Sequence, residues 1–143
     1  MDKHDVIRIV SNLSSELASS MLIHLKDVAT FVSDADVSMA ADIEQMASEE
    51  QDCLHRLADL LESLDALPGP PRVQAAIAAM PYNEIHVLIP RLIKDKTHLV
   101  ECCKQAAGMV TDYPAATECL AAVAQRHSQH LEKLNSMRAA KAS

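Results

Sequence analysis

The sequence predicts an all-α protein, a bundle of four long helices that fills a single domain over residues 1–143. Three observations lead to this prediction. The chain has only two Gly and is rich in Ala, Leu, Glu and Gln, a composition that favours helices. Apolar residues recur with the 3.6-residue period of an amphipathic helix through most of the chain. Turn and cap residues interrupt that period and divide the chain into helical segments.

The first helix is expected over residues 5–32, with apolar residues from Val6 to Phe31 on or near its inner face. The sequence SDADVS supplies turn and cap residues, and a second helix follows over 37–66. It ends at LPGPP, because prolines cannot continue a helix.

The third helix is expected over 83–110 and the fourth over 114–139. Pro90 lies within the first turns of the third helix, so this helix should either begin there or kink. GMVTDYP ends it, and Pro114 suits the first turn of the fourth helix.

The lengths of the connections predict the topology. Short loops join the first helix to the second and the third to the fourth, so each pair should form an antiparallel hairpin. Between the hairpins lies LPGPPRVQAAIAAMPY. At about 3.3 Å per residue, its roughly sixteen residues can cross the ~40 Å length of a helix of about 28 residues. We therefore expect two hairpins joined by a long crossover, although VQAAIAAM could instead form a short helix and reduce the reach.

Composition and charge exclude several classes of function. The formal net charge of −7 argues against binding nucleic acid through its phosphates. The start MDKHDVIRIV is too charged for a signal peptide, and no stretch approaches the roughly 18–20 apolar residues of a membrane span. We expect a cytoplasmic protein without a membrane or nucleic-acid partner. Its four cysteines form no disulfide-framework pattern and should remain thiols.

Polar residues interrupt the expected apolar stripe near the middle of every helix. In the second helix they are a carboxylate and a thiol, and a carboxylate in a core is costly unless a partner neutralises it. Because the midpoints of nearly equal helices share one layer, six side chains should converge: Glu16, Glu50, Cys53, Asp95, His127 and His130. Imidazoles that face carboxylates suit a divalent transition metal.

A lysine offers another way to neutralise Glu50. Lys94 or Lys96 on the third helix is available for this role, and a single buried His or Cys is usually a hydrogen-bonded core residue. The sequence alone therefore allows either a lysine or a metal ion as the partner of Glu50, but ligand-type side chains on all four helices favour the metal.

Three segments resemble those of ferritin-like proteins, in particular the bacterioferritin and mini-ferritin branches. NLSSELASSMLIHL is similar to the first-helix segment with its Glu ligand, and EEQDCLHRLADLLESLDALPGPP resembles the second-helix pattern E-E-x-x-H. RHSQHLEKL lies where the family has E-x-x-H. The resemblance implies a ferritin-like four-helix bundle that forms a homo-oligomer and holds a di-iron centre. It further implies a role in storage or in oxidation of Fe²⁺ by O₂ or peroxide.

Carried over by position, Glu16 matches the first-helix ligand, Glu50 a bridging carboxylate and His130 the family's His. The third-helix Glu corresponds to Asp95, or to Lys94 if the alignment shifts by one residue.

Two departures change the expected metal. Cys53 stands in place of a His, and His127 in place of the second bridging Glu. A neutral imidazole brings no negative charge to hold two cations together, so one Zn²⁺, Fe²⁺ or similar ion suits the set better than an iron pair. Haem is not expected, because Gln51 stands where the bacterioferritin haem Met follows the Glu. The short tail lacks the fifth helix of cage ferritins, which leaves a dimer or a twelve-subunit assembly.

The sequence thus predicts a ferritin-like protein that handles iron or another divalent transition metal such as zinc, with ferroxidase chemistry if it is an enzyme. One alternative is a ferritin-like scaffold or interaction protein without metal, which the residues at Cys53 and His127 favour. A remote alternative is a histidine-phosphotransfer bundle. IHLKD resembles that motif around His24, but Asp27 stands where the motif has Gly.

Overall fold

The computed structural model describes residues 1–25, 37–67 and 85–142. Its regular elements are helices: α1 (Lys3–Ala18), α2 (Met21–Leu25), α3 (Val37–Ser63), α5 (Ile85–Met109) and α6 (Pro114–Ala142). The predicted all-α class is confirmed for these residues. Within the same ranges, no helix combines the length and the low polarity that crossing a membrane requires.

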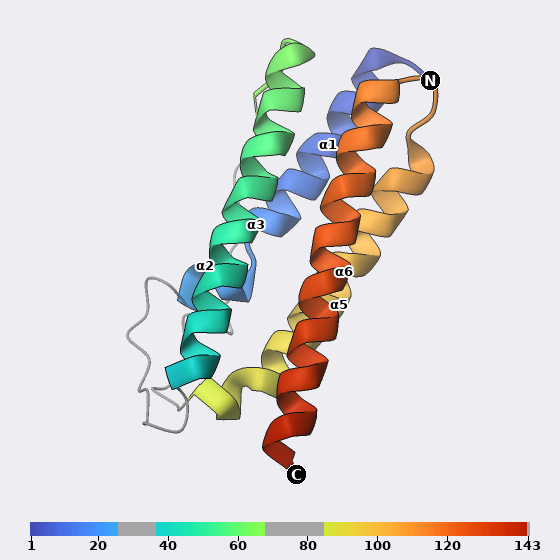
Figure 1. Ribbon diagram of the computed structural model, residues 1–143. Coiled ribbons are helices and arrows are strands. Elements are labelled where there is room, and N and C mark those ends of the chain that lie inside the picture. Colours follow the sequence, from blue (N-terminus) through green and yellow to red (C-terminus); the bar gives the residue numbers. More distant parts are fainter. Residues whose placement is uncertain (26–36, 68–84, 143) are drawn as a thin grey trace.

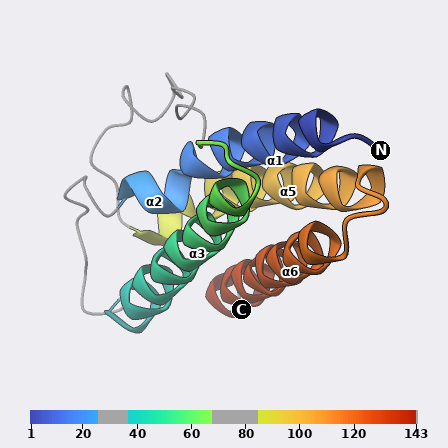
Figure 2. The same cartoon turned by 90° about the horizontal axis from the view of Figure 1, so that it is seen from above.

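The long helices form a bundle in which α1 and α6 run in one direction and α3 and α5 in the other (Figure 1). Helix α1 packs on α3 and α5, and α6 packs on the same two helices, as the view along the bundle shows (Figure 2). Helix α3 ends at one end of the bundle and α5 begins at the opposite end (Figure 1). The predicted crossover between them, like the predicted first loop, lies outside the described residues.

The prediction of one continuous helix over residues 5–32 is wrong at Ser19 and Ser20. Helix α1 ends at Ala18, where the backbone N–H of Ser19 donates to the carbonyl of Glu16 at 3.2 Å and that of Ser20 to the carbonyl of Leu17 at 3.1 Å. The Ser19 hydroxyl donates to the carbonyl of Ser15 at 3.0 Å. Serine side chains compete in this way with the backbone bonds of a helix, which explains the break. The rest of this prediction, residues 26–32, lies outside the described ranges, as does the side chain of His24.

The other helices begin and end close to the predicted residues. Helix α3 ends at Ser63 instead of 66, where the N–H of Ala66 bonds the carbonyl of Leu61 at 2.8 Å and Asp65 takes a left-handed φ of 61°. This is the Schellman type of helix end. Helix α5 contains Pro90 and its first turns run at an angle to the rest (Figure 1), as expected of a proline kink. Helix α6 begins at Pro114 as predicted and continues to Ala142.

The core consists of two apolar clusters with a polar layer between them. One cluster includes Leu13, Leu57 and Val123, and the other includes Leu92 and Leu134. Between the two clusters, α3, α5, α6 and the segment that joins α1 to α2 contribute buried polar side chains: Ser20, Glu50, Lys96, His127 and His130. We call these five residues the polar layer. They lie at the depth where the sequence predicted polar residues to converge.

Candidate functional site

The centre of the polar layer is built from three helices. Glu50 comes from α3, Lys96 from α5, and His127 and His130 from α6, and none of these four residues is more than 3% exposed. The two histidines are three residues apart, so they share one face of α6. Charged residues are almost never fully buried without a partner, which makes their mutual contacts decisive.

The Lys96 ammonium lies among the other three side chains. Its Nζ is 2.6 Å from Glu50 Oε2, 3.0 Å from His127 Nδ1 and 3.3 Å from His130 Nδ1. An ammonium has three N–H donors and no acceptor, so both Nδ1 atoms must accept and both rings carry their proton on Nε2. Three donors thus meet three acceptors, and Lys96 is the cation that neutralises Glu50.

Glu50 has a second partner in the segment that joins α1 to α2. The Ser20 hydroxyl contacts both carboxylate oxygens and is 2.9 Å from Oε2. Burial raises the pKa of the Glu50 carboxyl, while Lys96 and the Ser20 hydroxyl act against this rise. The break after α1 is what brings Ser20 to this position.

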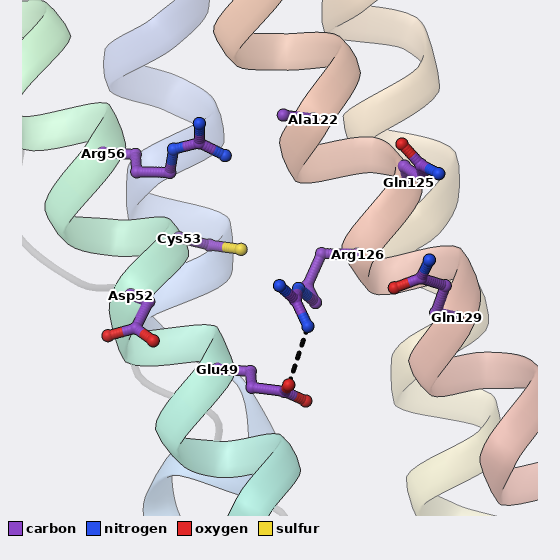
Figure 3. A pocket seen from close by; sticks show the side chains of 8 residues that line it. All are labelled: Glu49, Asp52, Cys53, Arg56, Ala122, Gln125, Arg126 and Gln129. Carbon is purple, nitrogen blue, oxygen red and sulfur yellow. Dashed lines mark hydrogen bonds and ion pairs between the residues drawn. The ribbon is translucent and has the colours of Figure 1, made fainter.

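The network continues from His130 to the surface. Its Nε2 donates to Glu49 Oε1 at 3.0 Å, and Arg126 donates to Glu49 Oε2 at 2.7 Å. Figure 3 shows the ion pair between α3 and α6, in a pocket whose wall includes Cys53. Burial opposes ionisation of Glu49, but the hydrogen bond from His130 and the charge of Arg126 lower its pKa.

Both imidazoles are held neutral. Burial, then the charge of Lys96 and the repulsion that a protonated His130 would exert, lower the pKa of His127 to about 2. Burial and Lys96 lower the pKa of His130 to about 4, against the opposing effect of Glu49. Neutral rings agree with Nδ1 accepting from Lys96. His127 Nε2 is buried and has no hydrogen-bond partner within the described part of the chain.

Of the six predicted ligands, the structure brings together Glu50, His127 and His130, whose ligand atoms lie within 4.8 Å of one another. The sequence offered Lys96 only as a possible partner for Glu50, but its Nζ lies among all three side chains. The reason is the spacing in α5, where the buried residues after Leu92 are Lys96 and then Leu99. Steps of three and of four residues both fit a helical stripe, so the sequence did not distinguish position 95 from position 96.

The other three predicted ligands lie elsewhere. Asp95 accepts a hydrogen bond from the backbone N–H of Met21 at 2.9 Å. Cys53 is buried between α3 and α6 and is not part of the group of ligand atoms. Glu16 is half-buried and its carboxylate lies 3.3 Å from His98 Nε2, so it belongs to a different group. The predicted core stripe through Glu16 and Asp95 is therefore wrong.

The resemblance to ferritin-like proteins implies an iron pair, and the donor set does not fit one. Glu50 is the single carboxylate among the three converging ligands, and Lys96 already neutralises it. Zinc or iron would need the lone pairs of the same atoms at about 2.0–2.2 Å. Because the ammonium already uses one lone pair on each of the three side chains, a metal ion there would have to displace Lys96.

The α5 register can be tested through its two adjacent thiols. Cys103 is buried and burial raises its pKa to about 12, whereas Cys102 is half-buried. Since thiolates are the reactive form, iodoacetamide should alkylate Cys102 in the folded protein and Cys103 only after unfolding. Fragment-ion mass spectrometry separates the two positions. Equal labelling of both thiols would contradict the register that places Lys96 in the core.

No protein-family model, curated protein or solved structure matches this chain.

Proposed function

We propose that this chain is a ferritin-like four-helix bundle in which a lysine takes the place of the mid-bundle metal, and that it acts as a scaffold or interaction protein without ferroxidase activity. One observation carries the proposal. The buried Lys96 ammonium donates to Glu50, His127 and His130, the three side chains that a metal would need.

The directions of the helices support the ferritin-like part of the proposal. Helices α3 and α5 run parallel, while α1 with α3 and α5 with α6 run antiparallel (Figure 1). This is the arrangement that two hairpins joined by a long crossover produce. The polar layer also lies at mid-height, where ferritin-like proteins hold their metal.

The energetics of the polar layer support a structural role. A buried ion pair adds little net stability compared with apolar residues, but loss of one partner is costly. A buried polar network in which every donor and acceptor has a partner holds the elements that it joins in a single arrangement. Here the contacts of Lys96 and Glu50 join α3, α5, α6 and the segment after α1, so the layer fixes how four parts of the chain meet.

The ring nitrogens of His127 and His130 provide a local test. In a Zn²⁺ titration followed by NMR, their chemical shifts should stay those of neutral rings protonated on Nε2. In a parallel assay, Fe²⁺ should be oxidised no faster than in buffer without protein. Stoichiometric movement of either Nδ1 signal, or accelerated Fe²⁺ oxidation, would overturn the proposal.

A second candidate is a binding site for a single divalent metal ion. It is favoured by the convergence of two imidazoles and one carboxylate within 4.8 Å, a ligand set found at mononuclear iron sites. This candidate requires Lys96 to leave the centre when the metal enters. Zn²⁺-dependent shifts of both Nδ1 signals, without Fe²⁺ oxidation, would establish it in place of the first.

The proposal retains the sequence-based expectations of a cytoplasmic location and of a homo-oligomer. Light scattering on the purified protein would check the oligomeric state.

A further inference from the structure

A second group of potential ligands lies where α1 packs against α5, separate from the polar layer. Glu16 comes from the last turn of α1, and His98 and Cys102 come from α5. We call these three residues the α1–α5 cluster. Glu16 and Cys102 are half-buried, and the His98 side chain is 61% exposed. Glu16 and Cys102 also line a groove with residues of both helices, so solvent reaches the cluster.

The sequence alone offered only half of this group. His98 and Cys102 are four residues apart on α5 and therefore share one face of the helix. Such a pair is common by chance. The fold adds a carboxylate from a distant part of the chain, because Glu16 faces outward from the bundle centre and meets the pair from α1.

The distances within the α1–α5 cluster match those around a tetrahedral metal ion. Zinc bonds of about 2.0–2.3 Å place neighbouring ligand atoms roughly 3.3–3.6 Å apart. His98 Nε2 is 3.3 Å from Glu16 Oε2 and 3.6 Å from Cys102 Sγ. All three ligand atoms lie within 4.8 Å of one another. The same nitrogen faces both partners, and one ring N–H cannot donate well to two groups at once.

The ligand types also select the metal. Thiolate, imidazole and carboxylate are the three kinds of side chain that bind Zn²⁺ in proteins. One thiolate and one carboxylate would balance the charge of a divalent ion. In the polar layer, by contrast, the charge of the carboxylate is already balanced by Lys96.

We propose that Glu16, His98 and Cys102 form a Zn²⁺ site with one coordination position open to solvent, and that the ion fastens α1 to α5. On binding, the Cys102 thiol releases its proton to solvent and its sulfur forms the bond to zinc. Glu16 donates a carboxylate oxygen and His98 the lone pair of Nε2. This inference is independent of the function proposed for the polar layer.

Cobalt is the probe, because Co²⁺ reports on thiolate ligands. Titration of the reduced protein with Co²⁺ should saturate at one ion per chain and produce a thiolate-to-cobalt band in the near ultraviolet with strong visible bands of tetrahedral Co²⁺. Zn²⁺ should remove them. The polar layer contains no thiol, so the thiolate band distinguishes the two sites. In the Zn²⁺ titration by NMR, the ring of His98 should shift.

Variants assign the ligands. Cys102→Ser should abolish the thiolate band, and Glu16→Gln and His98→Gln should weaken Co²⁺ binding by about 100-fold or more, since even residues behind metal ligands contribute roughly 10–100-fold. Cys119→Ser is the matched control, because Cys119 is also half-buried but lies on α6. His98 is exposed, so His98→Gln should fold normally even if another variant does not. Absence of the band in the wild-type protein, or its persistence in Cys102→Ser, would overturn the proposal.

Discussion

Lys96→Met is expected to lower the free energy of unfolding by about 3–5 kcal/mol when measured in EDTA, because it leaves Glu50 buried without its counter-ion. Lys96 and Glu50 are each 1% exposed, so water cannot replace the lost partner. His127 Nδ1 and His130 Nδ1 would also lose their donor. Denaturant unfolding followed by circular dichroism measures the change.

Two variants serve as controls for this result. Lys94→Met makes the same change at an exposed position two residues away and should alter stability by no more than about 0.5 kcal/mol. The double variant Lys96→Met with Glu50→Leu removes both charges and should be far less destabilised than Lys96→Met alone. If Lys96→Met changed the free energy of unfolding as little as Lys94→Met, the ion pair would not be what holds the layer together.

The partner also determines the sign of the effect at Glu50. If Glu50 were buried without a cation, Glu50→Leu would stabilise a metal-free protein. With Lys96 opposite, the same change leaves an ammonium unpaired, so it should destabilise the fold.

The Lys96→Met protein should in addition be stabilised by Zn²⁺ more than the Lys94→Met protein, because the lone pairs of Glu50, His127 and His130 become available.

The second large effect is a loss of stability in mild acid. His127 and His130 have folded-state pKa values of about 2 and about 4, below the ordinary 6.5. The unfolded chain therefore binds more protons below pH 6.5, and stability is complete above this pH and falls as the pH drops. Between pH 7 and 5.5 the two rings together should cost roughly 2–3 kcal/mol. The raised pKa of Glu50 acts in the opposite direction and offsets part of the loss at the acid end.

His127→Gln isolates one of these rings, since the glutamine oxygen can still accept from Lys96 but does not titrate. Its stability should fall less steeply over the same range, because the loss of about 1.2 kcal/mol that the removed ring contributes between pH 7 and 5.5 no longer occurs. His55→Gln, at an exposed position on α3, is the control and should keep the wild-type slope. An unchanged slope in His127→Gln would mean that this ring is not held neutral in the fold.

Helix composition and periodicity predicted most of the fold, and the misses have physical causes. The third and fourth helices begin and end within a few residues of the prediction, because Pro114 and the turn before it are strong local signals. The break at Ser19 was missed, since it depends on serine side chains bonding the backbone and on a partner in α3. Such tertiary contacts leave no periodic trace.

The sequence predicted only part of the candidate site, because part of the site depends on tertiary contacts. Glu50, His127 and His130 each interrupt an otherwise apolar stripe, so the sequence identified them. Lys96 was not placed among them because Asp95 fits the helical period equally well. The choice between a step of three and one of four residues is made by packing of α5 against its neighbours.

The polar layer has a mechanical consequence for the whole bundle. Apolar contacts between helices are only weakly specific, because one apolar side chain can take the place of another of similar volume. Lys96, by contrast, has acceptors at one height only. A slide of α6 by a single turn, about 5.4 Å, would carry both imidazoles away from the ammonium and leave a buried charge short of partners. The polar layer therefore fixes the position of each helix along the bundle axis. It thereby determines how far each helix extends past its neighbours and where the ends of the bundle lie.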